Sequence, residues 1–81
     1  MSTEVVVEVV AQLLDVDEEE LTAQRPLAAV AGWDSVNSLR VLVYLERELN
    51  VSLDYERFVA AQTVGDLAEI TADAQRAGAR P

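Results

Sequence analysis

Ser35 is the residue of this chain whose surroundings best suit chemistry. It stands in the segment Gly32-Trp33-Asp34-Ser35-Val36, where a long stretch of helical apolar periodicity begins. The chain contains no histidine, cysteine or lysine, so neither an imidazole nor an amine is present to activate a serine nucleophile. We therefore interpret Ser35 as a point of attachment for another group, although its position alone also fits an ordinary serine in a first helical turn.

The acidic run at residues 15–20 is the second group that could do chemistry. A calcium-binding loop that begins at Asp15 requires glycine at position 20 and glutamate at position 26, where the chain has Glu20 and Pro26. Zinc sites favour cysteine and histidine, and the sequence contains no glycine-rich phosphate loop. We therefore expect no metal site and no catalytic residue, and we interpret the carboxylates as a solvated face.

The composition is that of one small domain. A chain of 81 residues is the size of a single domain, and its 51% of apolar residues suffices for a core. We expect the domain to span residues 1–75, with a flexible tail over residues 76–81. No apolar run is long enough to span a bilayer, and no signal segment begins the chain, so we expect a cytoplasmic monomer.

The charge of the chain restricts its partners. Fifteen acidic residues oppose six arginines, which gives a net charge of −9, and seven of the acids lie in the first twenty residues. Such a surface repels nucleic acid and anionic lipid. It attracts proteins with basic patches and speeds their encounter.

Periodicity predicts an all-α fold. Three main helices are expected, over residues 4–14, over residues 35–49 and from Thr63 onwards, with one short helix between Asp54 and Phe58. The result is a small antiparallel helical bundle with a long first loop, residues 15–34, which Pro26 and Gly32 keep from being helical. A loop of this length often has a function. Three apolar residues are spaced to pin it to the core: Leu21, Leu27 and Val30.

Local signals mark the ends of the helices and their buried faces. Asn50 is suited to ending the second main helix in the left-handed conformation. Asp66 is placed for a capping box at the last helix. The expected N-caps are Ser2 or Thr3, Asp34, Asp54 and Thr63. The residues assigned to the core are Leu39, Leu42, Leu45, Phe58 and Ile70.

These segments resemble the acyl carrier and peptidyl carrier proteins. That family has an Asp-Ser-Leu-like triplet that opens its second helix, similar to Asp34-Ser35-Val36, and a segment similar to Thr63-Val64-Gly65-Asp66 that opens its last helix. The resemblance covers roughly residues 4–74. It implies that a phosphopantetheinyl transferase moves the 4′-phosphopantetheine arm of coenzyme A onto Ser35, with Asp34 as part of the recognition site. The terminal thiol of that arm then holds an acyl group as a thioester.

Three departures from the family pattern concern partners. Val36 stands where leucine or methionine is more usual, and Arg40 and Arg47 stand where the fatty-acid carrier usually has acids. The arginines interrupt a uniformly acidic docking helix, which disfavours partners matched to such a helix. The expected partner-binding residues are Trp33, Val36, Asn37, Arg40, Val43, Glu46, Arg47 and Ala61.

We therefore expect a free-standing carrier of polyketide, nonribosomal peptide or related specialised biosynthesis, which is itself no enzyme. Its expected partners are the transferase together with an acyltransferase, an adenylating ligase, or ketosynthase or condensation enzymes. A D-alanyl carrier of cell-wall modification is the alternative within the family, since Trp33 before the aspartate is also compatible with it. An unmodified acidic helical adaptor that binds a basic partner is the alternative from another class.

Overall fold

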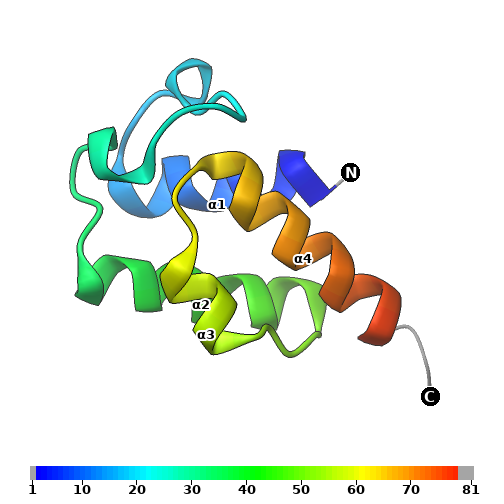
Figure 1. Ribbon diagram of the computed structural model, residues 1–81. Coiled ribbons are helices and arrows are strands. Elements are labelled where there is room, and N and C mark those ends of the chain that lie inside the picture. Colours follow the sequence, from blue (N-terminus) through cyan, green and yellow to red (C-terminus); the bar gives the residue numbers. More distant parts are fainter. Residues whose placement is uncertain (1, 79–81) are drawn as a thin grey trace.

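The computed structural model of the chain describes residues 2–78, and in that range four α-helices surround one core (Figure 1). This confirms the predicted all-α bundle of three main helices and one short helix. Two single turns of 3₁₀-helix, η1 and η2, lie in the long first loop. The elements are α1 (Ser2–Leu14), η1 (Glu18–Glu20), η2 (Leu27–Ala29), α2 (Ser35–Leu49), α3 (Tyr55–Ala60) and α4 (Val64–Gly78).

Helix α1 is the centre of the bundle. It runs antiparallel to α2, and α4 crosses both at an angle, while the short α3 packs against α4 (Figure 1). Val6, Val9 and Val10 are buried, and the valines on either side of Val6 are half-buried. Branching at Cβ disfavours a helix by restricting rotamers. Here contact with two helices at once offsets that cost, because each buried valine contributes on the order of 1.5–3 kcal/mol.

The start of α1 differs from the prediction. The helix already includes Ser2, so Thr3 lies inside it and neither residue precedes it as a cap. The end of the helix follows a local rule: Asp15 adopts φ +58°, and the N–H of Val16 donates to the carbonyl of Ala11 (3.2 Å). This is the left-handed termination that usually employs glycine.

The buried face of α2 is rotated relative to the prediction. Leu42 and Leu45 are buried as expected, but Leu39 is 42% exposed and was wrongly assigned to the core, while Val41 is fully buried. The apolar residues of α2 cover a wide arc, and periodicity alone does not fix which edge of that arc faces inward. Contact with α1 makes that choice.

The long first loop is attached to the start of α4. Leu21, Leu27 and Val30 are all buried, as predicted. Beyond these anchors, backbone bonds join the loop to residues 62–65: the N–H of Leu27 donates to the carbonyl of Gln62 (2.8 Å), and the N–H of Gly65 donates to that of Ala23 (2.8 Å).

This attachment explains Gly65. A Cβ at this position would lie 3.0 Å from the carbonyl oxygen of Ala23, closer than the ordinary separation of about 3.5–4.0 Å for non-bonded heavy atoms. Glycine is therefore required where the loop and the helix approach each other.

The two later helices begin as predicted. The carboxylate of Asp54 accepts from the N–H of Arg57 (3.2 Å) at α3. At α4 the bonds are reciprocal: the N–H of Asp66 donates to Oγ1 of Thr63 (3.1 Å), and Oδ2 of Asp66 accepts from the N–H of Thr63 (3.2 Å) and from that of Gln62 (2.9 Å). These bonds lower the pKa of Asp66 from its ordinary value of 3.8, and the bond from the N–H of Gln62 contributes most.

Helix α4 continues further than the expected domain boundary. It reaches Gly78, so residues 76–78 of the expected tail are helical, and residues 79–81 lie outside the described residues. Arg57 of α3 forms an ion pair with Asp73 of α4 (3.0 Å), and Arg76 also contacts this carboxylate. Among the described residues, no helix combines the length and the apolar character that crossing a membrane requires.

Candidate functional site

Ser35 is the first residue of α2, and its side chain is exposed. Asp34 precedes it with extended backbone (φ −143°), and the carboxylate of Asp34 accepts from the N–H of Asn37 (2.8 Å). Asp34 is thus the N-cap that the sequence predicts. Because Asp34 caps the helix, Ser35 lies at the point where the loop meets α2, and a partner can approach its hydroxyl there.

The neighbouring hydroxyl is engaged elsewhere. Oγ of Ser38 donates to the carbonyl oxygen of Ser35 (3.0 Å), and the side chain of Ser38 is half-buried. Within residues 2–78, Oγ of Ser35 makes no such bond. Of the two serines in the first turn of α2, Ser35 is therefore the accessible one.

The start of α2 is suited to an attached phosphate. The first N–H groups of a helix have no partner within the helix. The capping residue Asp34 occupies those of Asn37 and Ser38, through its carboxylate and its carbonyl respectively. The N–H groups of Ser35 and Val36 remain available, and the helix dipole also favours an anion at this end. These donors fit the phosphodiester of a phosphopantetheine group on Ser35.

A tight turn leads into the site. The N–H of Trp33 donates to the carbonyl of Val30 (3.1 Å), and Gly32, the third residue of that turn, has φ +85°. A type II turn requires positive φ at its third residue, which glycine adopts without strain. The Cβ of another residue here would have room, since its nearest neighbour is a leucine methyl at 3.7 Å. The glycine is therefore needed for its backbone conformation.

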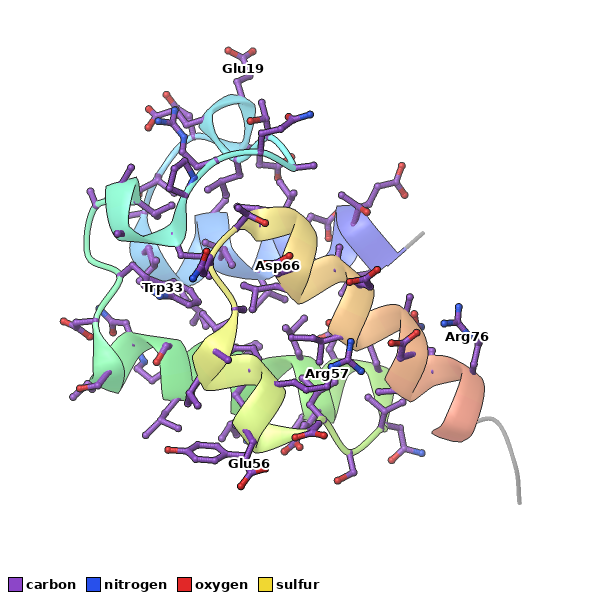
Figure 2. The ribbon with its side chains drawn as sticks, in the orientation of Figure 1. Glu19, Trp33, Glu56, Arg57, Asp66 and Arg76 are labelled. Carbon is purple, nitrogen blue, oxygen red and sulfur yellow. The ribbon has the colours of Figure 1, made fainter. Side chains whose placement is uncertain are left out.

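Trp33 faces the interior of the protein (Figure 2). The half-buried indole packs against the core, and its ring centroid lies 6.4 Å from that of Phe58 in α3. This contact joins the loop before Ser35 to α3. Because the indole is part of the packing, any role of Trp33 in binding partners is limited to its exposed edge.

Asn37 and Arg40 form contacts within the protein. The side-chain amide of Asn37 reaches back past Ser35, where Nδ2 donates to the carbonyl oxygen of Gly32 (2.8 Å). Oδ1 of Asn37 accepts from Nη1 of Arg40 (3.1 Å). The sequence predicted both residues as partner contacts and gave no sign of these bonds, because a polar side chain on a helix has many possible partners.

An apolar surface lies beside Ser35 on α2. Val36 is 67% exposed and Val43 is 48% exposed, and both were predicted to contact partners. The structure adds the exposed Leu39 to this surface. Two exposed apolar side chains of α3, Tyr55 and Val59, were not predicted to contact partners, because the sequence does not show which face of so short a helix is buried.

The other predicted partner residues lie farther along the chain. Glu46 is half-buried, and its Oε2 accepts from the backbone N–H of Leu53 (2.8 Å), so it holds the link between α2 and α3. This bond explains an acid at the edge of an apolar arc. Arg47 is exposed near the end of α2, and Ala61 is half-buried against the core. The part of the chain that the structure describes contains no cluster of three acidic side chains placed to hold a metal ion.

A family model of the phosphopantetheine attachment site matches residues 4–70. The chain is similar to the acyl carrier protein of Clostridium perfringens (strain 13 / Type A), with 32% identity over 62 residues, which cover 76% of this chain and 82% of that protein. It is also similar to the acyl carrier protein of Azobacteroides pseudotrichonymphae genomovar. CFP2, with 29% identity over 65 residues that cover 79% and 76% of the two chains.

Proposed function

This chain belongs to the family of carrier proteins that bear 4′-phosphopantetheine as a covalent prosthetic group, and we propose that Ser35 is the residue to which the group is attached. The observation that carries the proposal is the position of Ser35, exposed at the first residue of α2 behind the Asp34 cap. Ser38, the other serine of that turn, is half-buried and bonded to the backbone.

The attachment reaction transfers the phosphopantetheinyl group of coenzyme A. Oγ of Ser35 forms a bond to the phosphorus that bears pantetheine, the bond from that phosphorus to the nucleotide breaks, and adenosine 3′,5′-bisphosphate leaves. The hydroxyl proton passes to a base on the transferase, since this chain has no histidine or lysine and the carboxylate of the adjacent Asp34 already accepts from the N–H of Asn37. The N–H groups of Ser35 and Val36 are placed to stabilise the anionic product.

The attached group supplies a terminal thiol, on which acyl cargo is held as a thioester. The chain itself has no cysteine, so every thiol of the modified protein belongs to that group. The protein contributes presentation: a flexible arm on a rigid helix raises the local concentration of cargo at each partner enzyme. We therefore infer that the protein is a substrate of its partners and catalyses no step itself.

We further propose that the partners dock on α2 beside Ser35. Exposed apolar side chains such as Val36 and Val43 are suited to the centre of an interface. The exposed Arg40 and Arg47 give this helix a charge pattern unlike that of the strongly acidic remainder of the chain. These departures favour dedicated partners in a polyketide, nonribosomal peptide or related pathway, and a cytoplasmic location is part of the same proposal.

Mass spectrometry tests the attachment. Incubation of the unmodified protein with coenzyme A, Mg²⁺ and a promiscuous phosphopantetheinyl transferase should add the mass of one phosphopantetheine group. Ser35→Ala should abolish the gain, and Ser38→Ala should keep it, which makes Ser38 the matched control. An unchanged mass of the wild type, under conditions that load a control carrier, would refute the proposal.

Loading assays on the modified protein then identify the cargo. Acyltransferases and adenylating ligases that load acyl or aminoacyl groups would support the proposed pathway class. Loading by a D-alanine ligase alone would assign the chain to cell-wall modification instead. The family membership already disfavours an unmodified acidic adaptor, which requires no group on Ser35.

A further inference from the structure

We infer that Asn37, oriented by Arg40, is a positioning residue for the modification of Ser35, an inference that rests on the proposed function of Ser35. Two hydrogen bonds, one from Asn37 to Gly32 and one from Arg40 to Asn37, form what we name the Asn37 bridge. They hold the loop before Ser35 against the first turn of α2 and thereby fix the serine from both sides.

Asn37 donates two hydrogen bonds that span Ser35, and one of them belongs to the Asn37 bridge. The backbone N–H of Asn37 donates to the Asp34 carboxylate (2.8 Å), and its side-chain Nδ2 donates to the carbonyl oxygen of Gly32 (2.8 Å). Both acceptors precede Ser35 in sequence, and both donors follow it. One residue therefore closes the loop over the serine with two bonds.

The bridge requires an amide at position 37. An aspartate has the same shape, but its ionised carboxylate has no hydrogen to donate, and it would face the carbonyl oxygen of Gly32. A leucine would fill the same space without any polar contact. Both substitutions therefore remove the bond to Gly32, while only aspartate adds a charge.

Arg40 determines which way the amide faces. Its guanidinium only donates hydrogen bonds, so Oδ1 of Asn37 must turn toward Nη1 of Arg40 (3.1 Å). Nδ2 then faces Gly32, where a donor is needed. Arg40 thus acts on Ser35 through Asn37, one helical turn away.

The bridge should affect binding of the transferase more than the chemical step. If the loop samples several conformations, only the competent fraction binds, and the apparent affinity falls by that fraction. Asn37→Leu and Asn37→Asp should each raise the KM of the transferase for this protein by about fivefold to tenfold, as expected for loss of one hydrogen bond or two. The kcat should change by less than about twofold.

Two matched controls separate the bridge from general effects. Asn50→Asp makes the same chemical change at the other end of α2, where the left-handed conformation (φ +54°) also accepts aspartate. Arg76→Gln makes the same change as Arg40→Gln near the end of α4, at a residue that has no expected partner contact. Neither control should alter the KM, and circular dichroism should show that all variants are folded at the assay temperature.

A double-mutant cycle distinguishes positioning from direct contact. If Arg40 acts through Asn37, then Arg40→Gln should raise the KM in the wild type and have no further effect in Asn37→Leu. Effects that simply add on a logarithmic scale would show that Arg40 contacts the transferase itself, and would overturn its assignment as an orienting residue.

Trp33 supplies a readout that needs no enzyme. It is the one tryptophan of the chain and lies in the loop that the bridge holds. Acrylamide quenching of its fluorescence should increase in Asn37→Leu and Asn37→Asp and stay unchanged in Asn50→Asp.

The outcomes separate this inference from the proposed function. Normal modification of the wild type, with unchanged KM and unchanged quenching in the Asn37 variants, would overturn this inference alone. A raised KM in Asn37→Asp with a normal KM in Asn37→Leu would also overturn it, because charge would then be the cause. No modification of the wild type would overturn both.

Discussion

Two residues in the left-handed conformation show how this chain ends its helices. Asp15 (φ +58°) follows α1, and Asn50 (φ +54°) follows α2. In each case a backbone N–H beyond the turn closes the helix: that of Val16 donates to Ala11, and that of Val51 donates to Glu46. Asparagine tolerates this conformation better than most residues. Asp15 adopts this conformation close to four further acidic residues, at positions 17–20.

We predict that Asp15→Gly stabilises the protein. Glycine removes the steric cost of positive φ, and the substitution also removes a negative charge from the C-terminal end of a helix, where the dipole disfavours it. The free energy of unfolding should increase by about 0.5–1 kcal/mol. Urea unfolding, followed by circular dichroism, measures the change.

Asp15→Asn is the control for this prediction, because it removes the charge and keeps a side chain. The free energy of unfolding should increase less in Asp15→Asn than in Asp15→Gly. If the two variants gain equally, the effect is electrostatic and the backbone contributes nothing.

Residues whose roles are local were predictable from sequence, and residues whose roles depend on neighbours were not. Asp34, Asn50 and Asp54 act on backbone groups within a few positions, so their types and spacing sufficed. Leu39 was misassigned to the core because the orientation of α2 depends on α1. The bond from Asn37 to Gly32 also escaped prediction, since it depends on a turn that brings the carbonyl within reach.

Helix α4 depends on the carboxylate of Asp66 for its start. This side chain accepts from the N–H groups of Gln62 and Thr63, and these bonds lower its pKa. The same stretch of chain carries the backbone bonds to the long loop. The capping residues were evident in the sequence, but the loop attachment was not, because it pairs residues far apart in the chain: Leu27 with Gln62, and Ala23 with Gly65.

We predict that Asp66→Asn destabilises the protein in a pH-dependent way. A carboxyl whose pKa is lower in the folded state stabilises that state above its unfolded pKa, and this contribution disappears as the pH falls through the folded pKa. The wild type should therefore be more stable than the variant near neutral pH. The difference should decline below about pH 4.

Urea unfolding of both proteins between pH 3 and pH 7 tests this expectation. Asp54→Asn makes the same substitution at the N-cap of α3, and its effect on stability is compared with that of Asp66→Asn. A difference between wild type and Asp66→Asn that stays constant down to pH 3 would contradict the role assigned to the ionised carboxylate.

The negative charge of the protein is concentrated away from α2. Seven acids precede residue 21 without any arginine among them, and Glu19 points away from the body of the protein (Figure 2). Arg40, Arg47, Arg57 and Arg76 all lie in α2 or in later helices. A net charge of −9 on so small a protein destabilises the compact state by self-repulsion.

We predict that moderate salt stabilises this protein. Raising NaCl from about 10 mM to about 150 mM shortens the screening length from about 30 Å to about 8 Å. The melting temperature should rise by about 2–4 °C, which corresponds to roughly 0.5 kcal/mol for a domain of this size. Thermal unfolding by circular dichroism measures the shift.

A triple variant tests the origin of that shift. Glu18, Glu19 and Glu20 are exposed, and their joint replacement by glutamine should raise the melting temperature at low salt and reduce its dependence on salt. A melting temperature that falls with added NaCl would show instead that ion pairs such as Arg57–Asp73 outweigh the repulsion.

The attachment of the long loop to the start of α4 also has a consequence for the order of events during synthesis. The loop that leads to Ser35 is bonded to Gln62 and Gly65, which leave the ribosome later than the serine does. A nascent chain that ends before residue 62 contains Ser35 but lacks the segment that holds its loop. The serine thus takes its final place only after residues 62–65 have been made, so its presentation has to wait for the start of α4.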